Sequence, residues 1–228
     1  MVKQDPTNPT LHANLGGVYW NSNRKEEARA EWSMALAEDA NNVFALDDLG
    51  ISAASEKQYP EAIAYFQRAI AARPQFPKAH VHLAAALDSV RDSSAAEAEY
   101  QKALELSPFD VEARNAYAKF CLDRGRRKDA EEQYRLSLEV AASSDALDAL
   151  GRAAMERNDL NAAAKLFAQA SELNPIDSPA HFGLAEIHAK AGRIAAATLE
   201  YERGLETDPL NQAAQSALAK LRAAATLP

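Results

Sequence analysis

The chain has 228 residues, of which 47% are apolar, and its formal net charge at pH 7 is −8. An acidic chain of this kind argues against nonspecific nucleic-acid binding, and no stretch has the apolar length of a membrane span. There is no signal-peptide core at the amino terminus, and the single cysteine excludes an internal disulfide. These features leave the compartment open between the cytoplasm and the periplasm.

Small residues recur along the chain in six triplets of Gly, Ala or Ser. Within each triplet the second member follows the first by 12 residues and the third follows by 7 more, and successive triplets start 34 residues apart, with one step of 33. A period of about 34 residues is typical of a helical repeat array. The triplets are Gly16–Ala28–Ala35, Gly50–Ala62–Ala69, Ala84–Ala96–Ala103, Ala118–Ala130–Ser137, Gly151–Ala163–Ala170 and Ala185–Ala197–Gly204.

Three further positions repeat in the same register. An apolar residue precedes the first small one at Leu15, Leu49, Leu83, Tyr117, Leu150 and Leu184. An aromatic follows the second small one by four residues at Trp32, Phe66, Tyr100, Tyr134, Phe167 and Tyr201. Proline closes four of the six units at Pro74, Pro108, Pro175 and Pro209. An aromatic beside a small residue fills the space next to a close helix contact.

These motifs resemble the tetratricopeptide repeat (TPR) family. In chain order the units are 9–42, 43–76, 77–110, 111–143, 144–177 and 178–211, and unit 111–143 is one residue short, with Ala142 in place of the closing proline. The resemblance implies an all-α fold, a right-handed superhelical solenoid of antiparallel helix pairs.

The residues themselves also predict two helices in each unit. Apolar positions three, four and seven apart form one stripe, as at Ile63, Phe66 and Ile70. Between the two stripes of each unit stands a turn residue, and four of the six are Gly or Asn, which tolerate a left-handed conformation. No hairpin pair or sustained alternation predicts a strand. The turn residues are Asn23, Lys57, Arg91, Gly125, Asn158 and Gly192.

The two ends of the array differ. Residues 212–228 predict a capping helix with Ala214, Leu218 and Leu221 on one face. Residues 1–8 match the tail of a preceding repeat, which indicates a fragment of a longer protein. We then expect Leu11, Val18, Tyr19 and their neighbours to form an apolar patch at this end.

No catalytic, cofactor or metal site is predicted. Cys121 occupies a position that faces the partner helix, so an inert buried thiol is expected. His12, His80 and His181 share the fourth position of their units, where half-buried packing is expected in preference to a metal site. The basic cluster Arg124, Arg126, Arg127 and Lys128 is interpreted as a solvated turn.

The TPR resemblance also implies a concave groove lined by the first helix of each unit. Large apolar residues scattered among charges suit an extended or helical partner segment. The alternative is that these side chains only solvate the face or pack on their neighbours. The predicted lining residues are Asn14, Trp20, Phe44, Asp47, Ile51, Lys78, Val81, Asp88, Asn115, Lys119, Leu122, Asp148, Arg152, Met155, Phe182 and Glu186.

The sequence thus favours a non-catalytic scaffold that binds a protein or peptide of unknown identity, with no nucleic acid and no direct membrane insertion. One alternative is an accessory TPR domain of a larger enzyme or of a membrane-anchored assembly factor. Another is a self-association module that acts through the amino-terminal end.

Overall fold

The computed structural model describes residues 7–225, with side chains up to Ala223. Over these residues the chain forms thirteen α-helices and no strand. The helices group into two compact units, one ending at Tyr117 and the other beginning at Ala118, and helix α7 contains the boundary. The all-α prediction is confirmed.

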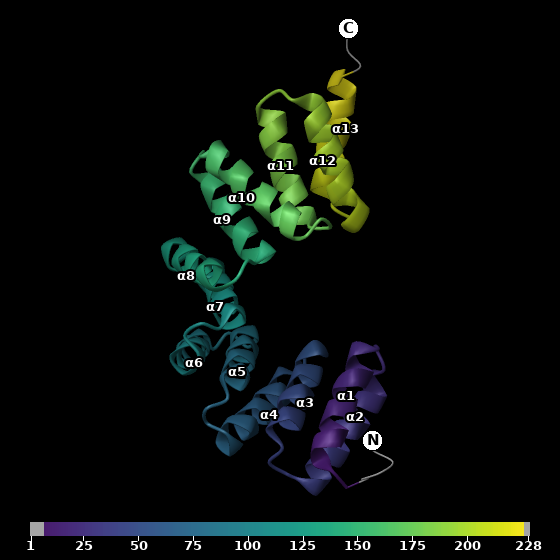
Figure 1. Ribbon diagram of the computed structural model, residues 1–228, viewed down its shortest axis with the longest axis vertical. Helices are drawn as coiled ribbons and strands as arrows, with labels where there is room; N and C mark the ends of the chain where they lie inside the picture. Colours follow the sequence, from purple (N-terminus) through teal and green to yellow (C-terminus); the bar gives the residue numbers. More distant parts are fainter. Residues whose placement is uncertain (1–6, 226–228) are drawn as a thin grey trace. The chain divides into compact units, whose positions relative to one another are not determined.

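The amino-terminal unit contains three helix pairs and the first half of α7 (Figure 1). The bounds are α1 Pro9–Asn21, α2 Lys25–Glu38, α3 Val43–Ser55, α4 Tyr59–Ala72, α5 Pro77–Ser89, α6 Ser93–Leu106 and α7 Val111–Asp123.

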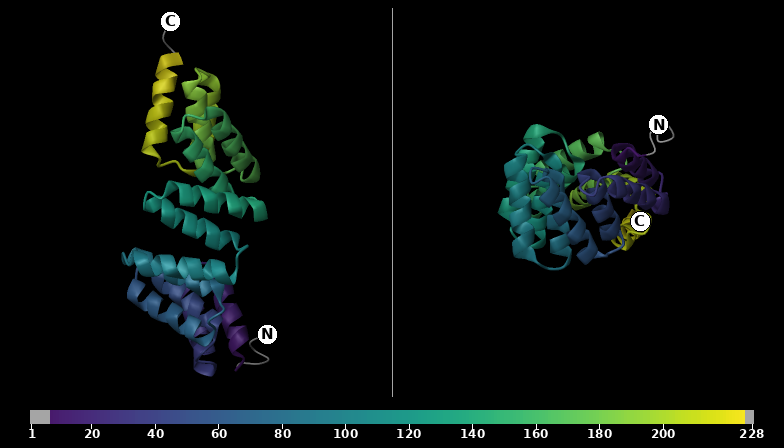
Figure 2. Two further views of the ribbon diagram at one scale, coloured as in Figure 1. Left: turned by 90° about the vertical axis from the view of Figure 1, so that its left-hand side faces the viewer. Right: turned by 90° about the horizontal axis from the view of Figure 1, so that it is seen from below.

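The carboxy-terminal unit contains the rest of α7 and six further helices (Figure 2). Among these, α9 packs on α10, α11 packs on α12, and α13 packs on α12. The bounds are α8 Arg127–Val140, α9 Ser144–Glu156, α10 Leu160–Leu173, α11 Ser178–Lys190, α12 Ile194–Thr207 and α13 Gln212–Ala225. The odd-numbered helices α1 to α11 each have 13 residues and the even-numbered ones each have 14.

The turns inside the helix pairs have one shared backbone conformation. All six predicted turn residues have a positive φ between 58° and 72°, including the two that are neither Gly nor Asn, Lys57 (63°) and Arg91 (65°). Gly and Asn tolerate this left-handed region, whereas a side chain of another kind is strained there. The repeat register therefore fixes the turn even where the residue type does not favour it.

The connectors between pairs have four residues, except after α8, where only residues 141–143 separate the helices. The residue that unit 111–143 lacks is therefore lost from the connector, and both of its helices keep their full length. Most connectors end in a side chain that caps the next helix; for example, the Asn42 and Asp177 side chains accept from the backbone N–H of Ala45 and Ala180.

The core follows the triplets. The second and third members of the triplets are buried. The first helix packs on the second in the pairs α1–α2, α3–α4, α5–α6, α9–α10 and α11–α12. In the units whose first small residue is glycine, the aromatic lies beside it: Trp32 lies against Gly16, Phe66 against Gly50 and Phe167 against Gly151. The small residue thus makes room for the ring, since a protein interior is packed without spare volume.

The last helix covers the end of the array. On α13, Ala214 and Leu218 are buried against Ala185 and Tyr201 of the preceding pair. The predicted capping segment forms a helix through Ala225, and residues 226–228 lie outside the described residues, as do residues 1–6 of the predicted amino-terminal tail. Asn8 of that tail caps α1 by accepting from the Thr10 and Leu11 N–H groups.

Candidate functional site

The first helices of neighbouring pairs contact one another in each unit. In the amino-terminal unit α1 contacts α3 and α3 contacts α5, and in the carboxy-terminal unit α9 contacts α11. In each unit we call the surface that its own first helices present the first-helix face of that unit. The sixteen predicted lining residues lie on α1, α3, α5, α7, α9 and α11.

The sixteen residues differ in exposure. Seven are exposed: Asn14, Phe44, Lys78, Lys119, Leu122, Arg152 and Glu186. Six are half-buried: Trp20, Ile51, Asp88, Asn115, Met155 and Phe182. Three are buried: Asp47, Val81 and Asp148. Position in the repeat therefore does not by itself decide which of these side chains offers surface to a partner.

Among the sixteen predicted lining residues, Phe44 is the large apolar side chain with most exposure. It is 51% exposed, its ring packs edge-on against Phe76 at a centroid distance of 5.8 Å, and the Arg73 guanidinium lies 5.3 Å from its centre. These contacts fix the ring while one side stays open to solvent. A fixed, partly exposed aromatic is a suitable anchor for a partner segment.

Phe182 lies differently from Phe44. Its ring packs against Gly204 of α12, where a Cβ would lie 2.6 Å from Phe182 Cδ1, and it stacks near Tyr201 at 6.3 Å. Gly204, the only glycine at the third triplet position, therefore opens a slot for this ring. Phe182 contributes mainly to the packing of α11 on α12.

Two buried aspartates stand on the first-helix face. Asp47 on α3 accepts from His82 Nδ1 on α5 at 2.9 Å. Beside it, burial and the charge of Asp47 raise the pKa of Asp48 to about 6, although His82 and Lys78 oppose this rise. Asp148 on α9 is 3% exposed, and its pKa is raised to about 8, first by burial and then by the charge of Asp177 and a hydrogen bond to it.

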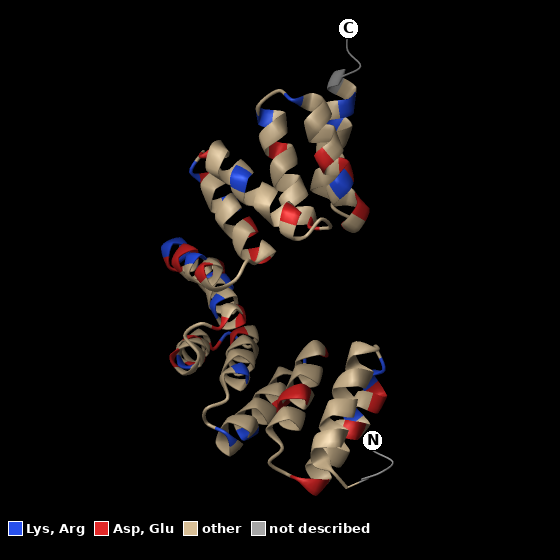
Figure 3. Cartoon of the chain, in the orientation of Figure 1, with Lys and Arg blue, Asp and Glu red and all other residues tan. Residues whose placement is uncertain are grey.

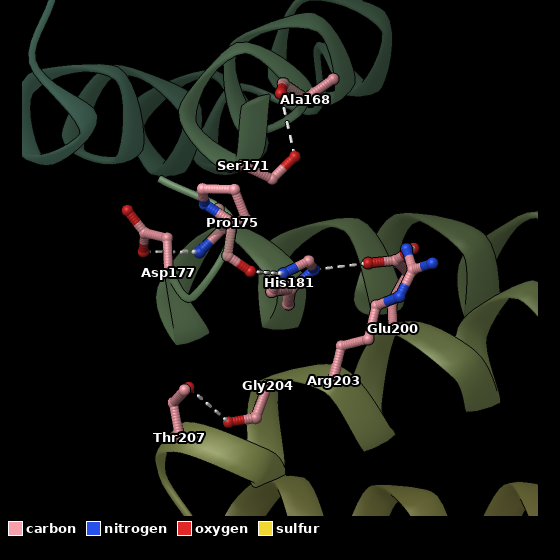
Figure 4. Close-up of polar contacts among 10 residues, drawn as sticks. Ala168, Ser171, Pro175, Asp177, His181, Glu200, Arg203, Gly204 and Thr207 are labelled. Carbon is pink, nitrogen blue, oxygen red and sulfur yellow. Dashed lines mark hydrogen bonds and ion pairs between the residues drawn. The ribbon is translucent and has the colours of Figure 1, made fainter. Parts of the chain in front are cut away.

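Three buried histidines join the two helices of a pair, and Figure 4 shows one of them. His181 Nδ1 lies 2.7 Å from Glu200 Oε2, and Nε2 donates to the Pro175 carbonyl at 3.1 Å. His80 makes the same two contacts with Glu99 and Pro74, and His12 pairs with Glu31 at 2.6 Å. The expected half-buried packing is wrong for these rings, which are 4–6% exposed and hydrogen-bonded.

The glutamate partners were not predicted because each follows its histidine by 19 residues, on the other helix of the pair. The repeats do carry a signal. Where the fourth position is His the unit has Glu 19 residues later, whereas Leu147 is matched by Leu166 and Leu46 by Tyr65.

The basic cluster at the start of α8 is exposed at Arg127 and Lys128, as expected, whereas Arg124 and Arg126 are half-buried. Arg126 pairs with Asp129, Arg127 pairs with Glu156 at 2.7 Å, and the Arg124 guanidinium lies 3.6 Å from the centre of the Phe120 ring. In Figure 3 the ribbon of α8 shows basic (blue) and acidic (red) residues next to one another. Cys121 is fully buried, and its sulfur accepts from Arg126 Nη2 at 2.8 Å.

Neither a metal centre nor a membrane span is found over residues 7–225. No group of three or more His, Cys, Asp or Glu side chains in this range could hold a metal ion. None of its helices combines the length and the apolar character that crossing a bilayer requires.

Solved structures of repeat proteins are similar to this chain. The Cut9-Hcn1 hetero-tetramer of the APC/C matches with a TM-score of 0.83 at 18% identity, over 96% of this chain and 44% of that chain. Yeast Tom70 matches with a TM-score of 0.77 at 19% identity, over 98% and 48%. PilF of Pseudomonas aeruginosa matches with a TM-score of 0.66 at 22% identity, over 81% and 85%. The chain thus spans less than half of the Cut9-Hcn1 and Tom70 chains.

Sequence comparison identifies the family of this chain but no individual relative. No curated protein matches the chain. Family models described as tetratricopeptide repeat match residues 48–89, 83–146 and 154–221. Together these matches cover residues 48–146 and 154–221, which is more than half of the chain. The chain belongs to the tetratricopeptide repeat family.

Proposed function

We propose that this protein is a non-catalytic scaffold that holds an extended or helical segment of a partner protein on its first-helix face. Tetratricopeptide repeats generally serve protein–protein interaction, and this general class of function follows from the family. The surface used and the form of the partner are the proposed part.

The observation that carries this proposal is Phe44. Its ring is 51% exposed yet held by Phe76 and Arg73, and half-buried Ile51 stands two turns further along the same helix. Half-buried Asp48 lies between Phe44 and Ile51 along α3, and the charge of exposed Lys78 on α5 acts on it. An apolar anchor with a polar rim is the arrangement from which protein interfaces draw most of their affinity.

A photo-crosslinking experiment tests the surface. The photoreactive amino acid p-benzoylphenylalanine replaces Phe44 in one variant and Phe109, which is 75% exposed in the connector before α7, in a second. Irradiation in the native cell should give a defined adduct from position 44 and none from position 109. Equal adducts from both positions, or an adduct from position 109 alone, would place the partner elsewhere.

Affinity provides the quantitative check once the partner is captured. Phe44→Ala should weaken binding at least about tenfold, since losing an aromatic anchor costs more than about 1.4 kcal/mol. Phe109→Ala should leave binding unchanged. If Phe44→Ala binds as tightly as the original chain, the first-helix face of the amino-terminal unit is not the docking surface.

The exposed side of α1 supports self-association as a second candidate. Val18 is 59% exposed. At the same repeat position on later helices, Ser52, Ala86, Phe120 and Ile187 are 2–3% exposed and Ala153 is half-buried. The predicted apolar patch is smaller than expected, because Leu11 and Tyr19 are half-buried and the Arg24 guanidinium covers the Tyr19 ring at 4.2 Å. Light scattering tests it: a dimer that Val18→Glu converts to a monomer would support this candidate, and a monomeric original chain would refute it.

A further inference from the structure

A polar cleft lies in the amino-terminal unit, where α3 packs between α2 and α4 (Figure 1). Its volume is about 190 Å³, which is room for a side chain, since one water occupies roughly 30 Å³ of the liquid. We call it the second-helix cleft. Its polar lining includes Arg29 and Ser33 on α2, Ser52 and Glu56 from α3, and Glu61 and Tyr65 on α4.

The cleft and the docking surface proposed above lie on different sides of α3. Phe44, Asp48 and Ile51 recur at intervals of four and three residues and form one stripe of the helix. Leu49, Ser52, Ala53 and Glu56 recur at the same intervals and form another stripe, which lines the cleft.

The charge of Arg29 is neutralised inside the cleft. Its Nε atom donates to Ser52 Oγ at 2.9 Å, and its guanidinium forms an ion pair with Glu56. Both charged side chains are about one third exposed, at 34% and 37%, so they are accessible from solvent. Ser33 Oγ donates to the Arg29 carbonyl at 2.7 Å, which leaves the lone pairs of the Ser33 oxygen to accept from a ligand.

Glu61 supplies a charge that nothing in the cleft balances. It is exposed in the first turn of α4 and forms no ion pair with a described residue. An ion pair equivalent to Arg29–Glu56, with its charges reversed, joins Glu131 and Arg157 at 2.6 Å in the carboxy-terminal unit, where Ala162 stands in place of Glu61. The ion pair therefore serves the packing of neighbouring helices, whereas Glu61 adds a carboxylate that this packing does not need.

The polar lining is not a general property of the repeat. Where α5 packs on α4 and α6 in the same unit, the equivalent positions are all apolar. Ile63, Ala86, Val90 and Ala95 stand there in place of Arg29, Ser52, Glu56 and Glu61. The fold thus does not require these polar groups, and they are available to recognise a ligand.

The acceptors in the cleft fit a primary ammonium group. Two carboxylates and one guanidinium give the lining a net charge of −1, and the Gln58 amide oxygen adds a further acceptor. An ammonium group offers three donors and no acceptor, so it can reach separate oxygens of Glu56 and Glu61. A planar guanidinium instead pairs best with both oxygens of one carboxylate, and Arg29 already occupies Glu56.

The floor of the cleft fits the alkyl stem that would carry this ammonium. Leu49 and Ala53 are 8% and 6% exposed and offer an apolar surface beside the Tyr65 ring. From Leu49 to Glu56 the floor is about 10 Å long, at 1.5 Å per residue. The four-carbon stem of a lysine can lie along such a surface while its charged end stays near water.

We propose that the second-helix cleft binds a lysine side chain of a partner protein, with the ammonium against Glu61 and Glu56 and the stem over Leu49 and Ala53. The inference goes beyond the proposed function, because it concerns another side of α3 and does not need Phe44. It assigns the amino-terminal unit a second contact, with a basic residue as its ligand.

The test titrates the full chain with two small probes at pH 7. Nα-acetyl-lysine methylamide carries the ammonium, and Nα-acetyl-norleucine methylamide has the same stem without it. The ¹H–¹⁵N resonances of Ser52, Ala53 and Glu61 are followed by NMR. Only the lysine probe should shift them, at millimolar concentration, and added salt should weaken the response because the charges are exposed. A response to the norleucine probe, or none to the lysine probe, would overturn the proposal.

Three variants at exposed positions make the result specific. Glu61→Gln should weaken binding of the lysine probe at least about tenfold, because the unbalanced charge is lost. Glu26→Gln changes an exposed acid in the first turn of α2 and should leave binding unchanged. Ser33→Phe should block the cleft from its rim and abolish the response. Equal affinities of Glu61→Gln and the original chain would overturn the proposal.

Crosslinking in the native cell separates a partner lysine from a small free amine, which carries the same chemical group. The amino acid p-benzoylphenylalanine replaces Ala64, which is exposed one turn after Glu61. It should give a protein adduct that Glu61→Gln removes. No protein adduct, or one that persists in Glu61→Gln, would refute a partner lysine. Phe44→Ala should preserve the response to the lysine probe, so this inference and the proposed function can fail separately.

Discussion

Gly50 leaves the space that the ring of Phe66 fills: a Cβ at Gly50 would lie 2.7 Å from Cδ1 of that ring. The same relation holds between Gly16 and Trp32, and between Gly151 and Phe167. Units with Gly at this position carry Trp or Phe with 1% exposure, whereas units with Ala carry Tyr with 5–6% exposure. The size of one residue in the first helix therefore sets how deeply the aromatic of the second helix is inserted.

Gly50→Ala should accordingly destabilise the protein. The added methyl group overlaps a buried ring, and overpacking of this kind costs about 1–3 kcal/mol. The matched control is Gly17→Ala, because nothing lies within 4 Å of a Cβ at Gly17 and alanine favours the helix interior by about 1 kcal/mol. Urea unfolding of both variants measures the difference; equal changes would contradict the insertion of Phe66 over Gly50.

Replacing the strained turn residues with glycine should increase stability. Lys57 and Arg91 have positive φ, so Lys57→Gly and Arg91→Gly should each stabilise the protein by about 0.5–1 kcal/mol by removing backbone strain. Gly125→Ala places a side chain in the same conformation and should destabilise by about 1 kcal/mol. Thermal unfolding checks the opposite signs, and a loss of stability in Lys57→Gly would show that the lysine side chain makes a contact of its own.

Substitutions of a buried histidine and of its glutamate partner should have non-additive effects on stability. Glu99→Leu removes an acceptor from a buried imidazole and should cost about 1–3 kcal/mol, and His80→Leu should cost a similar amount through the lost contacts to Glu99 and Pro74. The double variant reproduces the Leu147 and Leu166 pair found elsewhere in the array. The double variant should therefore lose less free energy of unfolding than the two single variants together, by at least about 1 kcal/mol. Additive losses in a double-mutant cycle would contradict a direct His80–Glu99 interaction.

The sequence predicts the helix pairs and turns of this protein well because the same weak local preferences recur in six units at fixed spacing. One turn residue such as Arg91 has no local preference for a positive φ, but its register with Asn23 and Gly125 places it correctly. The aromatic positions are predicted for the same reason. Each depends on a spacing that recurs six times rather than on one local propensity.

The candidate site is predicted less well because it depends on single contacts across helices. Phe44 and Phe182 have similar predicted roles from their repeat positions. The Phe182 ring, however, packs into the space that Gly204 leaves on α12. Repeat position likewise treats Asp47 and Asp148 alike, although only Asp47 has a histidine in the next unit. These differences arise from one neighbouring residue each, and a pattern shared by all units cannot show them.

The pH dependence of stability should reveal the buried state of Asp148. Its folded pKa of about 8 lies above the ordinary value of 3.8, so the folded protein holds this proton more tightly than the unfolded chain does. The contribution of the Asp148 proton to the free energy of unfolding is therefore complete below about pH 4. It is lost as the pH rises toward 8. Asp148→Asn removes this decline, because an amide stays neutral and can donate to Asp177.

Urea unfolding of the original chain and of Asp148→Asn at pH 5, 7 and 9 measures the effect. The variant should gain on the original chain as pH rises, by about 1–3 kcal/mol at pH 9, the usual cost of a buried polar group without a partner. Asp145→Asn, with its exposed side chain, should follow the original chain at all three values. Parallel stability curves for the original chain and Asp148→Asn would mean that Asp148 is already ionised at neutral pH and that some other group satisfies its charge.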